Sequence, residues 1–174
     1  MVNVNPAFQV QDLKYALNNA GISALVMPEQ FSHSHYVDII RHLIPNIEKY
    51  HGSIIKSLEV PDLKYVIVCD HKKHKGMINF EDLYTIYTKN DEKEMHEREK
   101  NCNFEAATNI QFTSGTTGYP KGATLSHHNI MNNANQIAVQ MSYTQDTKIC
   151  VPVPLYHCFG MVIGSLAGLN SGAT

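Results

Sequence analysis

The chain has 174 residues, of which 43% are hydrophobic and 17% are charged, and its formal net charge is −2. This composition is that of a folded globular protein long enough to bury a substantial core. The charge argues against nucleic acid as the main partner, because binding to a phosphate backbone requires a basic face. No apolar run approaches the roughly 20 residues that cross a bilayer, and the first residues carry no basic-apolar targeting signal.

In the N-terminal half, helical and strand patterns alternate. Apolar residues at helical spacing predict a helix over residues 9–20. The apolar runs Ile22–Met27 and Leu63–Cys69 each predict a buried strand. Between these strands, Ser34 is expected to cap a second helix that Pro45 ends or kinks.

The middle of the chain contains its most polar stretch. Residues 80–87 predict a short helix, and the sequence DEKEMHEREK at 91–100 predicts a solvated helix or a connecting loop rather than a docking site. The apolar stretch Asn109–Phe112 then predicts a strand.

Helix and strand patterns also alternate in the C-terminal part. An apolar stripe predicts a helix over residues 126–141, with Met131 and Met141 on its buried face. A strand at Ile149–Val153 and a small-residue-rich helix to about Leu169 follow. This alternation predicts an α/β fold with a mostly parallel β-sheet flanked by helices. Ligands of such open sheets bind beyond the carboxyl ends of the strands.

Cysteine and histidine spacing does not indicate a metal site. The cysteines are Cys69, Cys102, Cys150 and Cys158. They lack C-x-x-C spacing, which argues against a zinc knuckle or a redox pair, so we predict reduced core thiols of an intracellular protein. The neighbouring pairs His33/His35 and His71/His74 have no third ligand at a familiar spacing, which favours surface or core histidines.

The run FTSGTTGYPKG at residues 112–122 predicts a binding site for a polyphosphate. Its glycines let backbone N–H groups approach an anion, its hydroxyl groups are further donors, and Lys121 adds an ammonium group. The run is not a Walker A loop, because an apolar β-type sequence rather than a helix follows Lys121. It predicts a strand, a phosphate-binding loop and a second strand. An ordinary Gly/Ser/Thr hairpin turn is the alternative, which the fixed positions of Pro120 and Lys121 disfavour.

Taken together, four segments resemble the adenylate-forming (AMP-binding) superfamily of acyl-CoA synthetases, nonribosomal adenylation domains and luciferases. The run 112–122 is similar to its phosphate-loop signature, and PVPLYHCFG at 152–160 is similar to its next motif, in the form found in medium-chain acyl-CoA synthetases. The segment Val2–Ala7 resembles an N-N-P-type turn of these enzymes, and Gly122–Asn129 resembles their fatty-acid-activating branch. The resemblance extends over nearly the whole chain.

The resemblance implies a two-step reaction. A carboxylic acid attacks the α-phosphorus of ATP to give an acyl-adenylate, and coenzyme A then displaces AMP to give a thioester. ATP, Mg²⁺ and coenzyme A would be required, and no residue of this chain is assigned as a metal ligand. Tyr119 and Pro120 would shape the turn. The residues expected to bind the phosphates are Thr113, Ser114, Gly115, Thr116, Thr117, Gly118 and Lys121.

His157 is the candidate catalytic residue. A single histidine in an apolar region is more often structural than functional. The resemblance, however, implies that His157 borders the reacting carboxylate and the α-phosphate. There it would donate a hydrogen bond to the charge that develops during adenylation.

The resemblance also implies that the chain is part of the large N-terminal domain of an adenylate-forming enzyme. We expect residues 1–174 to be incomplete at both ends, without the C-terminal domain, and inactive alone, because the adenine, ribose and lysine motifs of these enzymes are missing. Its small-molecule partner would be a carboxylic acid; the sequence does not predict an oligomeric state. The family suggests a mitochondrial location, with the cytoplasm as the alternative. Two alternatives remain open, a nucleotide-binding module without catalysis and a non-catalytic interaction protein, and nucleotide titration separates them.

Overall fold

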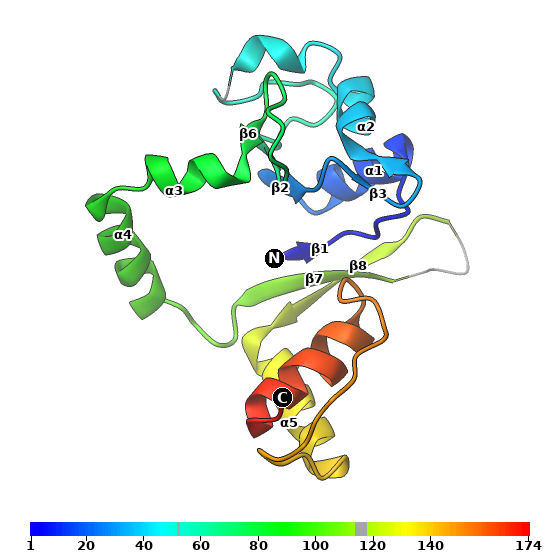
Figure 1. Ribbon diagram of the computed structural model, residues 1–174, viewed down its shortest axis with the longest axis vertical. Helices are drawn as coiled ribbons and strands as arrows, with labels where there is room; N and C mark the ends of the chain where they lie inside the picture. Colours follow the sequence, from blue (N-terminus) through cyan, green and yellow to red (C-terminus); the bar gives the residue numbers. More distant parts are fainter. Residues whose placement is uncertain (52, 114–117) are drawn as a thin grey trace. The chain divides into compact units, whose positions relative to one another are not determined.

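The computed structural model describes residues 1–51, 53–113 and 118–174, which form two compact units (Figure 1). Pro6–Asn101 is called the N-terminal unit here, and Met1–Asn5 together with Cys102–Thr174 is called the loop unit. Each unit combines a small sheet with helices, so the α/β class is confirmed. Among the described strands, three pairings are parallel and two are antiparallel. No helix within these residues is both long and apolar enough to cross a membrane.

The N-terminal unit is built on a parallel sheet with the strand order β2-β5-β6. Its core contains Leu17 and Ile40, which are almost completely buried. The sheet strands are β2 (Ala24–Met27), β5 (Tyr65–Val68) and β6 (Ile78–Asn79), and β3 (Gln30–Phe31) and β4 (Ser34–His35) form a separate antiparallel pair. The helices are α1 (Val10–Asn19), α2 (Tyr36–Leu43), η1 (Ile47–Tyr50), η2 (Phe80–Asp82), α3 (Leu83–Ile86) and α4 (Lys89–Lys100).

Two predictions for this unit need correction. Ser34 does not cap α2, because it pairs with Phe31 in the β3-β4 ladder; the carbonyl of Glu29 instead accepts the first helical amide, that of Tyr36, at 3.0 Å. The strand β2 is not buried along its length, since Val26 is 52% exposed on a face of the sheet that the unit leaves open. The predicted helix over 9–20 is confirmed as α1.

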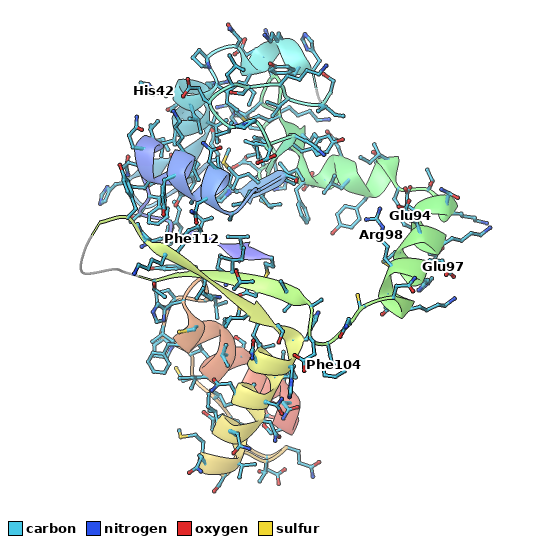
Figure 2. The ribbon with its side chains drawn as sticks, turned by 180° about the vertical axis from the view of Figure 1, so that it is seen from behind. His42, Glu94, Glu97, Arg98, Phe104 and Phe112 are labelled. Atoms are coloured by element: carbon cyan, nitrogen blue, oxygen red, sulfur yellow. The ribbon has the colours of Figure 1, made fainter. Side chains whose placement is uncertain are left out.

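Helix α4 is the solvated helix that the polar sequence predicts. None of its residues is buried. Thr88 and Asp91 form a capping box at its start, and the hydrogen bond from the Thr88 hydroxyl lowers the pKa of Asp91. Its surface carries ion pairs between Glu94 and Arg98 and between Glu97 and Lys100 (Figure 2). Such exposed pairs contribute only a few tenths of a kcal/mol each.

The loop unit contains the hairpin that the phosphate-loop sequence predicts. Strand β1 (Val2–Asn3) lies parallel to β7 (Ala107–Thr113), and β8 (Lys121–Ser126) lies antiparallel to β7. The two predicted strands are therefore confirmed, whereas residues 114–117 of the predicted loop between them lie outside the described residues. Helices α5 (His127–Gln140), η3 (Phe159–Leu166) and α6 (Ala167–Ser171) cover one face of this sheet (Figure 1).

Helix α5 begins where β8 ends, at Ser126. The Ser126 hydroxyl accepts a hydrogen bond from the Asn129 amide at 3.2 Å, and the Asn129 side chain accepts one from the Ser126 amide at 3.0 Å. The predicted buried face is confirmed only in part, because Met131 and Met141 are 42% and 59% exposed. The buried core of this unit is formed by Ile130, Ala134, Ala138, Val162 and Ala167.

Replacing Ser126 with alanine should destabilise the loop unit by about 1 kcal/mol, because one amide at the start of α5 loses its side-chain acceptor. The change is measured as the shift in the urea midpoint, followed by NMR peaks of α5. Ser126→Asp is the matched control, since aspartate also accepts this hydrogen bond and should retain most of the stability. Equal losses in both variants would contradict the capping role.

The segment 149–154 is not the strand that its sequence predicts. Pro152 and Pro154 have no amide hydrogen, so neither can donate to a neighbouring strand. The Ile149 amide donates to the Thr174 carbonyl at 2.8 Å. The segment instead packs against a row of glycines. A Cβ atom would lie 2.4 Å from the Pro154 oxygen at Gly160, 2.6 Å from Val151 Cγ1 at Gly164, and 2.9 Å from Ile149 Cδ1 at Gly168. The glycines therefore allow the extended segment to pack closely against η3 and α6.

The prediction of core thiols is wrong. Cys69, Cys102, Cys150 and Cys158 are free, but all four are exposed. Cys69 follows β5 rather than lying within it, and Cys150 lies in the extended segment whose neighbouring side chains meet the glycine row. Within the described residues, no three histidine, cysteine or acidic side chains are placed to hold a metal ion.

Candidate nucleotide-binding site

The described edge of the phosphate loop is the end of the β7-β8 hairpin. Thr113 and Lys121 form its last strand pair, and the Thr113 hydroxyl donates to the Lys121 carbonyl at 3.3 Å. Figure 2 shows Phe112 at this end of the hairpin. The structure thus brings Thr113 and Lys121 together. Four of the predicted phosphate ligands, Ser114, Gly115, Thr116 and Thr117, lie outside the described residues.

The conformations of Gly118 and Lys121 suit the binding of an anion. Gly118 has a φ of +94°, which explains why glycine stands there, and a Cβ atom at this position would meet nothing within 4 Å. Lys121 is exposed, and among the described residues its ammonium group has no hydrogen-bond or ion-pair partner. An open backbone next to a free cation can accept a phosphate group without displacing an internal contact.

His157 lies in the turn that leads into η3. Its amide donates to the Pro154 carbonyl at 3.2 Å, and its Nδ1 accepts from the Phe159 amide at 3.2 Å. Because an amide N–H can only donate, Nδ1 presents its lone pair, and the proton of the neutral ring lies on Nε2. The ring is exposed, so Nε2–H is available to donate to a ligand oxygen.

The expectation that His157 follows a strand end is wrong, since 149–153 is not a strand. Its position is instead fixed by the helix that follows. Met161 donates its amide to the His157 carbonyl at 3.0 Å, and the Met161 sulfur contacts the Gln111 side chain on β7 at 3.6 Å. Residues 159–166 are π-helical, a geometry that is frequent at functional sites. Strand β7 therefore contains Thr113 and also contacts the His157 turn through Met161.

Sequence reasoning missed a group of buried amides on β7. Asn109 and Gln111 are 3% and 7% exposed, and the Gln111 amide nitrogen donates to Asn109 Oδ1 at 2.9 Å. Asn3, which pairs with Gln111 in the β1-β7 ladder, directs its own amide toward Met161. The alternation of polar residues at 109 and 111 is the signal that could have shown them, because such residues share one face of a strand.

A concave region lies in the N-terminal unit, beyond the carboxyl ends of β5 and β6. It has a volume of about 280 Å³ and is lined by Cys69, Asp70, His71, Phe80 and Glu81. The Lys72 amide donates to the Asp70 carboxylate and lowers the pKa of Asp70, which favours its charged form. Two carboxylates disfavour a polyphosphate here, and no predicted site residue lines this region.

Solved structures share the fold over nearly the whole chain. The anthranilate CoA ligase AuaEII, in complex with anthranoyl-AMP, has a TM-score of 0.70 at 18% identity and is matched over 99% of this chain and 29% of its own. ATP-bound MatB from Rhodopseudomonas palustris has a TM-score of 0.65 at 21% identity, over 98% of this chain and 28% of its own.

The family follows from the sequence comparison. The model of the AMP-binding enzyme family matches residues 1–174, and the chain belongs to this family. It is 42% identical to the zebrafish (Danio rerio) mitochondrial medium-chain acyl-CoA ligase ACSF2, over 100% of this chain and 29% of the relative. It is 36% identical to Bacillus subtilis YngI, which is provisionally named an acyl-CoA synthetase, over 99% of this chain and 32% of the relative. The chain thus spans about a third or less of the length of these relatives.

Proposed function

We propose that this chain is the phosphate-binding part of an acyl-CoA synthetase that activates a fatty acid, of medium chain length, through an acyl-adenylate. The observation that carries the proposal is the hairpin end, where the Lys121 ammonium has no partner within residues 1–51, 53–113 and 118–174 and adjoins the loop predicted to bind phosphate. Sequence similarity to acyl-CoA ligases supports the same reaction class. We call the full-length protein in which the chain would perform this reaction the parent enzyme.

In the proposed reaction, ATP supplies the adenylyl group, which turns a carboxylate into a reactive mixed anhydride. The task of this chain is to hold the β- and γ-phosphates. Lys121 offsets their negative charge, the loop amides and hydroxyl groups donate to their oxygens, and the open backbone at Gly118 lets them approach. Mg²⁺ would offset phosphate charge when bound, and no residue of this chain is assigned as its ligand.

His157 is proposed to act at the reacting centre. Its Nε2–H is left available by the amide that occupies Nδ1, so it can donate to an oxygen of the carboxylate or the α-phosphate. A fixed donor of this kind stabilises the charge that develops as the new P–O bond forms.

Both compact units are proposed to belong to one large domain of the parent enzyme, because the family model runs through both of them. Coenzyme A and the carboxylic acid would then bind with the help of residues beyond this segment. A mitochondrial location of the parent enzyme is a further proposal, supported by the name of the zebrafish relative. Imaging of the tagged full-length protein would test it.

Titration of the purified chain with ATP and with pyrophosphate tests the proposal. Both ligands should bind, and Lys121→Ala should weaken each by about 10- to 150-fold, because a charge-assisted hydrogen bond is lost. Lys148→Ala is the matched control, since Lys148 is another exposed lysine of the loop unit and its loss changes the net charge equally. AMP, which lacks the β- and γ-phosphates, should respond little to either change.

The outcomes separate the candidate functions. The isolated chain is expected to bind ATP without catalysing ATP–pyrophosphate exchange, because it does not position adenine, ribose and the acid by itself. Exchange catalysed by the parent enzyme would then support the proposed reaction. Binding with no exchange in the parent enzyme would favour a nucleotide-binding module. If neither nucleotide nor pyrophosphate binds, the chain is better explained as an interaction protein. Exchange by the isolated chain above the Lys121→Ala level would show that it holds a complete site.

A further inference from the structure

The Met161 side chain lies where three segments of the loop unit meet. Its sulfur is 3.3 Å from the amide nitrogen of Asn3 on β1 and 3.6 Å from that of Gln111 on β7. Met161 itself belongs to η3 and is half-buried. A thioether is a weak acceptor, and two amide groups directed at one sulfur are therefore an unusual arrangement in a protein interior.

The buried side-chain amide of Gln111 has its two hydrogens directed at two protein acceptors. Gln111 is 7% exposed, and its amide nitrogen donates one hydrogen to Asn109 Oδ1, so the other is directed at Met161. A buried donor without an acceptor is unfavourable, so the sulfur does more than fill space. Loss of this acceptor would force the amides to turn toward water or backbone, and both strands and helix would have to adjust.

The two ends of this contact lead to the two parts of the candidate site. Gln111 lies two residues before Thr113, the first residue predicted to bind phosphate, and one ladder pair, Phe112 with Gly122, separates them. On the helix side, the Met161 amide donates to the His157 carbonyl at 3.0 Å, so the turn that holds the imidazole is tied directly to Met161. The contact thus connects β7 to the His157 turn through two described bonds.

We propose that Met161 is a positioning residue, whose thioether acts as a hydrogen-bond acceptor and fixes the His157 turn relative to the strand that begins the phosphate loop. The structural part of this proposal is independent of the reaction, whereas its effect on nucleotide binding rests on the proposed function. The alternative is that Met161 only fills volume in the core.

Two substitutions separate an acceptor from a filler. Met161→Leu keeps an apolar side chain of similar size and removes the acceptor. Met161→Gln has nearly the same length and shape and replaces the sulfur with a stronger acceptor, its carbonyl oxygen. Met131→Leu is the control, because Met131 lies on α5 of the same unit and is 42% exposed. The experiment uses the full 174-residue chain.

Three readouts are compared. Hydrogen exchange of the Asn3 and Gln111 side-chain amides reports the contact itself, the ¹⁵N shifts of the His157 ring report the turn, and ATP titration reports the site. Met161→Leu should accelerate the amide exchange roughly tenfold, move the His157 shifts and weaken ATP binding. Met161→Gln should lie closer to the wild-type chain in all three readouts. The control Met131→Leu should match the wild-type chain.

The reverse order, with Leu retaining wild-type exchange and His157 shifts while Gln loses them, would overturn the proposal in favour of simple packing. Unfolding of the Leu variant with a folded Gln variant supports the acceptor role, and unfolding of the Gln variant or of both variants contradicts it. If the wild-type chain does not bind ATP, the proposed function fails, but the first two readouts still decide the role of Met161.

Discussion

Replacement of His157 with alanine is expected to slow formation of the acyl-adenylate in the parent enzyme by about 10²- to 10³-fold, the usual effect of removing one fixed donor to a developing charge. The Nδ1 atom is held by the Phe159 amide at 3.2 Å, so the ring presents Nε2–H without further reorganisation. Thioester formation should change much less, because no new P–O bond forms in that step.

Single-turnover measurement of the two half-reactions tests this assignment. His127→Ala is the matched control, since His127 is an exposed histidine of the same unit at the start of α5. His157→Gln should recover part of the rate, because its amide nitrogen can donate from a position near that of Nε2. A defect confined to the thioester step would show that His157 does not serve adenylation.

The glycine row beneath the 149–154 segment should show a graded response to alanine. Gly160→Ala places a Cβ atom 2.4 Å from the backbone oxygen of Pro154, which cannot move without displacing the His157 turn. A loss of about 3 kcal/mol or more is expected, the upper range for overpacking. Gly164→Ala meets Val151 Cγ1 at 2.6 Å and should cost about 1–3 kcal/mol, because a β-branched side chain has few alternative rotamers.

Gly168→Ala is the internal control of this series. Its new Cβ meets only the end of the Ile149 side chain, at 2.9 Å, and alanine favours the helix by up to about 1 kcal/mol over glycine. Its net effect should therefore lie within about 1 kcal/mol of zero. Native-state hydrogen exchange of the α5 amides measures all three variants in the loop unit. Equal costs at the three positions would mean that helix propensity, not close approach, explains the glycines.

Local signals in the sequence predicted the elements that depend on local physics. The hairpin followed from β-type residues on both sides of a glycine-rich run, and α5 followed from an apolar stripe that starts after Ser126. Helix α4 was predicted as solvated because it has almost no apolar residue to bury. In each case neighbouring residues carry the information, so no knowledge of distant contacts is needed.

The failures occurred where a distant partner decides the outcome. The apolar residues at 149–153 suggested a strand, but a strand needs a hydrogen-bonding neighbour, and the prolines and the glycine row leave the segment packed on a helix. The buried amides of Asn109 and Gln111 were missed because their partners are distant in sequence. The Asn109 amide donates to the Met1 carbonyl, 108 residues away, and the Gln111 amide is directed at the Met161 sulfur, 50 residues away. The residues of the candidate site were predicted, but the contacts that orient His157 were not.

The pairing of β1 with β7 has a consequence for how the chain folds. Val2 is aligned with Ile110, and the whole N-terminal unit, Pro6–Asn101, is inserted between the two strands. During synthesis this unit can fold while β1 is still unpaired, because β7 is made only after Asn101. Nonlocal pairing of this kind makes the loop unit slow to assemble. The strand that carries Thr113, a residue proposed to bind phosphate, would therefore be among the later parts of the molecule to reach its native pairing.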